Sequence, residues 1–273
     1  MRITLFTSNQ PRHSAFVSKL AQICDELYVV VESTTIFPGK IPSFFSSSSI
    51  MQEYFKEVLL SEKKFFGPAG FIPPSVNLLN LSYGDLKYLS TEDLGKAASS
   101  DIFLVFGCGF ISGEVGDFLI KRSALNIHMG ASPYYRGASC NMWAMYDKKP
   151  EFIIGTVHNL SNEIDSGSIV FQVLPPVDMY EPFDLGMAAV KATLAEILKR
   201  VKNQSIYQSD VIDQPVNLTK KLCKKSQFTD TVAKALLKNR MTPKEIKNIL
   251  ANRKLNDFFN PVISSLDLEN FKG

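Results

Sequence analysis

Short apolar runs alternate along this chain with longer segments in which apolar residues return every three or four positions. Residues 2–7 (RITLFT) and 27–31 (LYVVV) have the apolar, β-branched composition of buried strands. The segment between them has one apolar face, which is typical of a helix and consists of Phe16, Leu20, Ile23 and Leu27. A strand, a helix and a second strand at this spacing predict a βαβ unit, and hence a parallel sheet.

The same alternation continues to residue 201. Apolar runs predict strands at residues 76–81, 101–106, 124–127, 153–159 and 168–174. Helical periodicity predicts helices at residues 50–66, 90–98, 138–146 and 184–201. Thr91 is expected to cap the helix at residues 90–98. The pattern therefore predicts an α/β fold in which helices flank a mostly parallel sheet.

The last part of the chain has a different character. Residues 211–222 are polar with short β-like pieces, and residues 230–237 and 243–250 predict two small helices. We therefore expect a large domain at residues 1–203 and a small C-terminal α+β module at residues 204–273.

The charge of the chain limits the partners that it is expected to have. The 273 residues carry a formal net charge of +3 with a pI of about 8.5, and 45% of them are hydrophobic, which suffices for a sizeable core. The densest basic run is short and is interpreted as a solvated surface: Lys220, Lys221, Lys224 and Lys225. A nucleic-acid-binding protein usually has a more concentrated basic face.

Signals for membrane insertion, secretion and metal binding are missing from the sequence. No apolar run approaches the roughly 18 residues of a membrane span, and the N-terminus MRITLFTS is too short for a signal peptide. The four cysteines lie far apart without a CxxC pair, so no zinc or other metal is expected. We expect a cytoplasmic protein without a membrane partner.

A chemically useful set of polar side chains follows the strand predicted at residues 124–127. Asn126 and His128 are two positions apart, so their side chains point to the same side of an extended strand. Asp165 lies in the turn between the next two predicted strands and can approach from the opposite wall. An amide, an imidazole and a carboxylate can move an acyl group without a metal. Ligands of open parallel sheets bind beyond the carboxyl ends of the strands, where Asn126 and His128 are expected.

The two other histidines of the chain are expected to be structural. His13 is predicted at the exposed start of a helix, whereas His158 lies within a predicted strand and is interpreted as a hydrogen-bonded interior residue. Ser132 and Ser139 lack the strand–turn–helix setting of a nucleophilic serine, which disfavours a serine hydrolase.

Two segments resemble a known family. NIHMGASPYYRGAS, from residue 126, resembles the Asn-x-His and Pro-x-Tyr-Arg-Gly motif of the folate-dependent formyltransferases. GTVHNLSNEIDSGSIV, from residue 155, resembles that family's strand–turn–strand segment. Together with the order of the predicted elements, the resemblance covers residues 1–201. It implies a Rossmann-like fold, 10-formyltetrahydrofolate as the formyl donor and an amine as the acceptor.

The resemblance also assigns roles to particular residues. It makes Asn126, His128 and Asp165 the catalytic three. It places the pterin of the folate between two backbone walls, which consist of Gly109, Phe110 and Ile111 and of Glu163 and Ile164.

Members of this family differ in the acceptor. They include methionyl-tRNA formyltransferase, glycinamide ribonucleotide formyltransferase and the sugar N-formyltransferases of surface-polysaccharide pathways. The short and moderately basic tail argues against tRNA, and the SNQPRH loop at residues 8–13 departs from the Gly-Ser-rich loop of the glycinamide ribonucleotide enzymes. The resemblance therefore favours a nucleotide-linked amino sugar, for a surface polysaccharide or a nonulosonic acid, and no nucleic acid.

A sugar acceptor implies further site residues. Those expected to face the sugar, its phosphates or the base are Asn9, Arg12, Tyr134, Tyr135, Arg136 and the loop at residues 37–49. The two tyrosines either stack on the base or only shape their loop. Apolar C-terminal residues either form a homodimer surface, as in the sugar enzymes, or pack the small helices: Phe228, Leu236, Leu237, Ile246, Ile249 and Leu250.

Three other functions stay open from the sequence. The chain resembles methionyl-tRNA formyltransferase in its catalytic half, and a non-catalytic folate-binding relative would keep the fold while losing activity. The intact set of Asn126, His128 and Asp165 argues against such a loss. A hydrolase of 10-formyltetrahydrofolate is disfavoured because the chain begins directly at the first predicted strand, without the regulatory domain that those enzymes carry.

Overall fold

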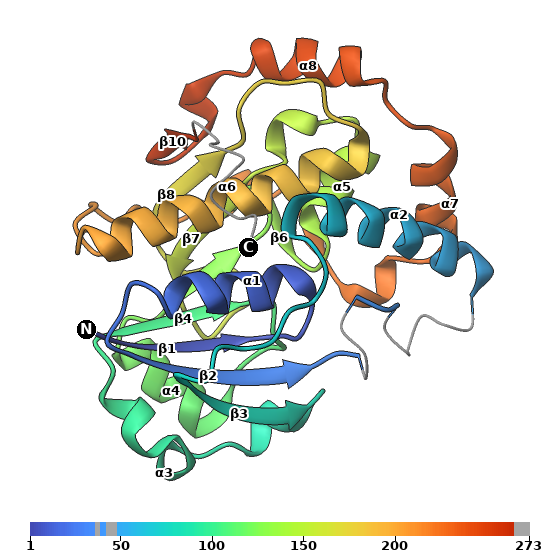
Figure 1. The fold of residues 1–273 in the computed structure, drawn as a ribbon. Coiled ribbons are helices and arrows are strands. Elements are labelled where there is room, and N and C mark those ends of the chain that lie inside the picture. Colours follow the sequence, from blue (N-terminus) through green and yellow to red (C-terminus); the bar gives the residue numbers. More distant parts are fainter. Residues whose placement is uncertain (36–38, 42–47, 265–273) are drawn as a thin grey trace.

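One central sheet of eight strands organises the chain (Figure 1). The computed structural model describes residues 1–35, 39–41 and 48–264. The strands of the sheet lie in the order β10-β8-β7-β5-β4-β1-β2-β3. Their bounds are β1 Arg2–Thr7, β2 Glu26–Ser33, β3 Val76–Ser82, β4 Ile102–Phe106, β5 Leu125–His128, β7 Gly155–Asn159, β8 Ile169–Leu174 and β10 Pro261–Ile263. Two further strands, β6 Tyr135–Gly137 and β9 Lys221–Cys223, pair with each other in a separate small sheet.

The direction of the strands confirms the predicted fold class. The five strands β3, β2, β1, β4 and β5 are parallel neighbours. β7 is antiparallel to β5 and β8, and β10 is parallel to β8. The result is a Rossmann-like, mostly parallel α/β sheet, as the alternation of apolar runs predicted.

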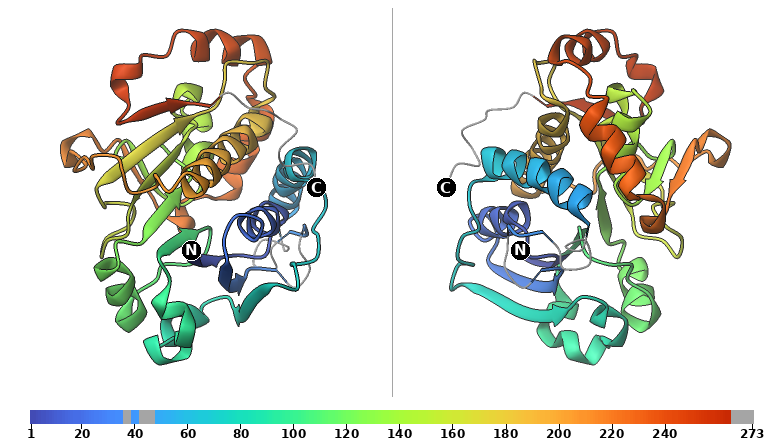
Figure 2. Two further views of the ribbon diagram at one scale, coloured as in Figure 1. Left: turned by 60° about the vertical axis from the view of Figure 1, so that its left-hand side comes forward. Right: turned by 90° about the vertical axis from the view of Figure 1, so that its right-hand side faces the viewer.

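Helices cover both faces of the sheet. Their bounds are α1 Pro11–Leu20, α2 Ser49–Phe66, α3 Thr91–Leu94, α4 Gly113–Lys121, α5 Cys140–Tyr146, α6 Pro182–Lys202, α7 Asp230–Lys238 and α8 Pro243–Ala251. α1, α2 and α6 lie on one face, and α3 and α4 lie on the other (Figures 1 and 2). Of the helices that the structure describes, none combines the length and the apolar character needed to cross a lipid bilayer.

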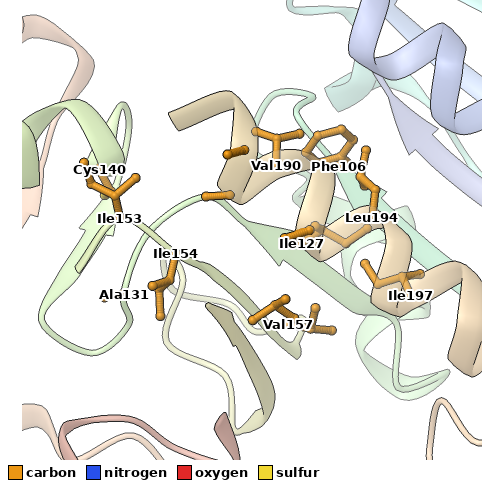
Figure 3. Close-up of a cluster of buried hydrophobic side chains, with 14 of the residues drawn as sticks. Phe106, Ile127, Ala131, Cys140, Ile153, Ile154, Val157, Val190, Leu194 and Ile197 are labelled. Atoms are coloured by element: carbon orange, nitrogen blue, oxygen red, sulfur yellow. The ribbon is translucent and has the colours of Figure 1, made fainter. Parts of the chain in front are cut away.

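Alternating side chains of the strands fill two hydrophobic cores. In β4, Leu104 and Phe106 join the larger core with α1, α2 and α6, whereas Phe103 and Val105 join a smaller core with α4. The larger core includes a cluster of Val190, Leu194 and Ile197 of α6 with Ile127 and Val157 of the sheet (Figure 3). This packing fixes β5, which carries two of the candidate site residues.

Residues beyond 203 pack closely against the rest of the chain. β10 is an edge strand of the main sheet, and β9 pairs with β6. α7 contacts α2 and α5. The apolar residues considered for a homodimer surface pack inside the chain instead: Phe228, Leu236, Ile246 and Leu250 are buried, and Leu237 and Ile249 lie against the same core. Of the two alternatives, packing of the small helices is the one that the structure shows.

Several local expectations need correction. Ser90, not Thr91, caps α3, because its hydroxyl accepts from the Asp93 N–H while the Asp93 carboxylate accepts from the Ser90 N–H. α3 is only one turn long and continues as a 3₁₀ helix at Gly95–Ser99. α5 begins at Cys140 rather than at residue 138, because Gly137 and Ser139 have left-handed backbone angles. The sequence pattern did not predict α4, β6 or β10.

Candidate active site

Strand β5 carries two polar side chains on the side opposite to its core residue. Ile127 packs under α6 (Figure 3), so its neighbours Asn126 and His128 point away from that core. The Asn126 Nδ2 group donates to Oδ1 of Asp165 over 2.9 Å, and Nδ1 of His128 lies 3.1 Å from Oδ2 of the same carboxylate. The structure thus brings the three predicted catalytic residues into contact.

Asp165 reaches this position through the shape of the β7–β8 connection. β7 ends at Asn159, which pairs with Leu125 at the amino end of β5. The connection therefore turns back along β5, and Asp165 has a left-handed φ of 46°. Oδ2 of Asp165 also accepts the Gly137 N–H over 2.8 Å, so elements on both sides of the carboxylate fix its position.

His158 is part of the same network. It pairs directly with Asn126 in the β5–β7 register. Its Nδ1 lies 2.8 Å from the Asn159 carbonyl oxygen, which can only accept, so Nδ1 carries a proton. Nε2 is then free to accept the second Asn126 amide N–H over 3.1 Å. His158 is buried and hydrogen-bonded as predicted, but the sequence reasoning gave it no part in the site.

Burial acts against charge on both His128 and Asp165. It lowers the pKa of His128 below its ordinary value of 6.5, and the nearby Asp165 carboxylate offsets only part of this effect. Burial would raise the pKa of Asp165, but His128, His158 and the Gly137 N–H outweigh it and hold that pKa well below its usual range. At neutral pH the carboxylate is therefore ionised and the His128 ring is neutral.

The surroundings of His128 prepare the ring for a second proton. Nδ1 faces the Asp165 carboxylate, and Nε2 lies 3.1 Å from the Tyr135 carbonyl oxygen. A neutral ring can donate to only one of these acceptors, whereas a protonated ring donates to both. His128 can therefore take up a proton during a reaction without losing a hydrogen bond.

His13 occupies a different place from the one predicted. It is buried, not exposed: its Nδ1 accepts the Gln10 N–H over 3.1 Å, and its ring packs edge-on against Phe106 with centroids 4.9 Å apart. Burial, followed by the charge of Arg12, lowers its pKa well below the ordinary value. The residue is buried because Gly107, which has no side chain, leaves room for the ring.

A cavity of about 760 Å³ is lined by Asn126, His128 and Asp165 among other residues. The two predicted folate walls both line it, one formed by Gly109, Phe110 and Ile111 and the other by Glu163 and Ile164. The side chains of Phe110 and Ile164 are 56% and 46% exposed. Two exposed apolar side chains at the edge of a cavity fit an extended aromatic ligand that would cover them, so these residues fit a folate.

The Gly109 wall is held by a buried acid. Glu32 accepts the Gly109 N–H over 2.6 Å and the Gly84 N–H over 2.8 Å. A Cβ at Gly109 would lie only 2.9 Å from the Glu32 carboxylate, so a larger residue there would displace this carboxylate. The sequence pattern assigned no role to Glu32, which directly follows the strand predicted at residues 27–31.

Four of the five residues assigned to the acceptor do not line this cavity among the described residues. Asn9 donates to the Thr35 carbonyl, the Tyr134 hydroxyl donates to the Asp257 carbonyl, and the Tyr135 hydroxyl donates to Asp147. Arg136 donates twice to the Ile164 carbonyl oxygen and so supports the Asp165 turn. Arg12 does line the cavity, but its guanidinium pairs with buried Glu62 over 2.7 Å.

Further residues around the cavity were not predicted from the sequence. Most of the loop at residues 37–49 lies outside the described residues, namely 37–38 and 42–47. Residues of α2, α6 and the C-terminal part form a further wall of the cavity: Tyr54, Phe55, Val58, Phe183, Met187, Lys224, Lys225 and Phe228. Helical periodicity could indicate only that the apolar members of this wall face inward, not that they face a cavity.

Comparisons with known proteins agree at the level of the fold. No protein-family model and no curated protein sequence matches the chain. An uncharacterised Mycobacterium tuberculosis protein, considered a sugar N-formyltransferase, superposes with a TM-score of 0.52 at 16% identity, covering 96% of this chain and 92% of its own. A 4-N formyltransferase from Francisella tularensis gives a TM-score of 0.50 at 16% identity, with 83% and 77% covered.

A third structure was solved with ligands. The N-formyltransferase from Helicobacter canadensis, in complex with folinic acid and dTDP-3-aminofucose, gives a TM-score of 0.50 at 12% identity, with 86% of this chain and 80% of its own covered. Identities this low establish a shared fold and leave the reaction open. The chain therefore has the Rossmann-like fold of the folate-dependent formyltransferases.

Proposed function

We propose that this protein transfers a formyl group from 10-formyltetrahydrofolate to the amine of a nucleotide-linked amino sugar. The observation that carries the proposal is the contact of one buried carboxylate, Asp165, with both the Asn126 amide and the His128 imidazole beside a large cavity. Fold similarity to sugar N-formyltransferases supports the same reaction. Formylated amino sugars of this kind serve the building of surface polysaccharides or nonulosonic acids, and we propose this role here.

The formyl group of the donor is attached to a nitrogen atom. Side chains of this protein would stabilise the charges that develop during the transfer and would move the amine proton. Asn126 would hold the formyl oxygen, on which negative charge develops, with the amide N–H that donates to Asp165 in this structure, while His158 keeps the other N–H. The attacking amine becomes positive, and the ionised Asp165 carboxylate stabilises that charge. The amine proton would pass by way of the Asp165 carboxylate to the neutral His128 ring, whose charged form donates to both Asp165 and Tyr135. The proton would then be delivered to the donor nitrogen as its bond to the formyl carbon breaks, which releases tetrahydrofolate.

The cavity supports the assignment of donor and acceptor ends. Phe110 and Ile164 offer apolar cover for the folate rings next to Asp165. Residues of α2, α6 and the C-terminal part also line the cavity and are available to the acceptor. We therefore propose that Tyr134, Tyr135 and Arg136 support the catalytic loop and do not contact substrate.

The test uses purified full-length protein, 10-formyltetrahydrofolate and a panel of nucleotide-linked amino sugars, with methionyl-tRNA as a further acceptor. We expect release of tetrahydrofolate together with a formylated sugar detected by mass spectrometry. Asn126→Ala, His128→Ala and Asp165→Ala should each lower turnover by about 100-fold or more, because each removes an acid–base or oxyanion contact. Asp117→Ala, at an exposed carboxylate of α4, is the control and should leave turnover unchanged.

Three results would contradict the proposal. Formylation of methionyl-tRNA alone would move the acceptor to tRNA. Release of tetrahydrofolate and formate without any acceptor would make the protein a hydrolase. Near-normal turnover in the His128→Ala variant, with an unchanged thermal midpoint, would remove that residue from the mechanism.

A further inference from the structure

The four lysines of the C-terminal basic run fall into two pairs with different surroundings. Lys220 lies over the Phe152 ring, with its Nζ 4.6 Å from the ring centroid. Lys221 pairs with the Asp147 carboxylate over 3.1 Å and lies over the Trp143 ring. Lys224 and Lys225, in contrast, line the cavity beside the catalytic three. The run is therefore not a uniform solvated surface.

The β6–β9 pair fixes the two cavity lysines relative to Asp165. Gly137 of β6 pairs with Cys223 of β9, and the Ala138 N–H donates to the Cys223 carbonyl over 2.8 Å. The Gly137 N–H is also the donor to the Asp165 carboxylate. Lys224 directly follows Cys223. The position of Lys224 therefore depends on the same strand pair that binds the Asp165 carboxylate.

The charges in the cavity are distributed unevenly. The cation of Arg12 is neutralised by Glu62, which is buried. Within the described part of the chain, Lys224 has no salt bridge with a carboxylate. Lys225 donates to the Tyr83 hydroxyl over 3.0 Å and lies over the Tyr83 ring. Phe55 and Phe228 line the same cavity, so Lys224 and Lys225 add two basic side chains to a partly aromatic lining.

We infer that Lys224 and Lys225 bind the phosphates of the acceptor, so that the C-terminal part of the chain forms a diphosphate subsite of the active site. This inference rests on the proposed function. A nucleotide-linked sugar carries its amine on one side of the ring and its diphosphate on the other, so the amine reaches Asp165 while the phosphates reach a nearby cation pair. Lysine ammonium groups suit this task as mobile point charges with several donors.

Binding of diphosphates tests the inference without catalysis. Isothermal titration calorimetry of the full-length protein would use inorganic pyrophosphate, UDP and dTDP as probes, with inorganic phosphate as a second arm. We expect the Lys224→Ala/Lys225→Ala double variant to bind pyrophosphate and the nucleoside diphosphates at least about tenfold more weakly. The Lys224→Arg/Lys225→Arg variant should retain most of the affinity, and the matched control Lys220→Ala should bind as the wild type does.

Steady-state kinetics then tests whether the diphosphate subsite contributes to binding of the sugar acceptor. In the double alanine variant the KM for the sugar acceptor should rise about tenfold or more, while kcat and the KM for 10-formyltetrahydrofolate stay close to the wild-type values. An unchanged KM in a variant that formylates the sugar overturns the inference, as does an equal loss of affinity in Lys220→Ala, which would mark a general charge effect. Lysine-dependent pyrophosphate binding without any formyl transfer would overturn the proposed function and leave the subsite standing.

Discussion

Asp165 connects the residues of the candidate site, because its two carboxylate oxygens accept from Asn126, His128 and the Gly137 backbone. Ionisation of this carboxylate is stabilised by the same contacts, which hold its pKa well below the usual range even though burial opposes charge. The residue therefore organises the site electrostatically as well as sterically.

His158 should position Asn126. His158→Ala removes the acceptor of one Asn126 N–H, so we expect kcat to fall about tenfold or more, with the KM for 10-formyltetrahydrofolate unchanged. His158→Gln places an amide oxygen near the former Nε2 position and should recover a large part of kcat. Steady-state kinetics of both variants provides the measurement, and equal kcat values for His158→Ala and the wild type would contradict the positioning role.

His13 should make the fold sensitive to acid. Its folded-state pKa lies well below 6.5, so below pH 6.5 the unfolded chain binds a proton that the folded chain does not. Stability should therefore fall as the pH decreases from 6.5, by about 1.4 kcal/mol per pH unit for this one group, until the folded pKa is reached. His128, with a lowered pKa, acts in the same direction.

The His13→Asn variant isolates this effect. An Asn amide can accept the Gln10 N–H at the position of Nδ1 but does not titrate. Urea unfolding at several pH values between 5 and 7 should give a shallower decline of stability for the variant than for the wild type. Equal slopes would show that His13 does not titrate differently on unfolding.

Single residues of the site were predictable only in part. Asn126, His128 and Asp165 were found because their motif lies in contiguous segments of the sequence. His158 and Glu32 were assigned no role, because their partners come from neighbouring strands or distant turns, and those contacts depend on register. The tyrosines of the 134–136 loop were placed toward the acceptor by analogy, whereas the structure turns their hydroxyls to Asp257 and Asp147.

The β6–β9 pair is the element on which the geometry of the site most depends. Gly137 has a φ of 99°, and a Cβ on it would overlap the Cys223 carbonyl oxygen. Gly137→Ala therefore combines backbone strain with a steric clash, and we expect a loss of stability of about 2 kcal/mol or more together with a strong loss of the proposed formyl transfer activity.

Gly84→Ala is the matched control for this change. Gly84 has a similar φ of 96°, but a Cβ there meets no atom within 4 Å. It should therefore show only the cost of the left-handed backbone, about 1–2 kcal/mol, and keep turnover. Thermal unfolding and turnover of both variants give the comparison, and equal effects would show that the Cys223 contact is unimportant.

Prediction of elements succeeded where periodicity extends over many residues. The pattern predicted α2 and α6 nearly to their ends, as well as the strands of the parallel half of the sheet. It missed β6 and β10, because strands of three residues have no measurable period and pair with segments about 85 residues away or more. It missed α4 because Gly113 and Gly116 weaken the helical signal.

At the scale of the whole molecule, the chain should unfold as one unit. Residues of α7 and α8, such as Val232 and Ile246, belong to the same core as β1 and β5, and β10 extends the main sheet. Calorimetry should therefore give a single transition with equal calorimetric and van't Hoff enthalpies. A fragment of residues 1–203 should lack a cooperative transition, since it exposes the core that α7 and α8 cover. Two separate transitions in the full chain would contradict this view.

The pairing of β6 with β9 has a consequence for protein engineering. An exchange of the C-terminal part between proteins of this fold would separate two strands that pair with each other. Residues Tyr135–Gly137 and Lys221–Cys223 would have to be transplanted together, although 83 residues separate them in the chain. We expect chimeras that divide the chain between these strands to have a displaced Asp165 carboxylate, because the Gly137 N–H that binds it belongs to β6.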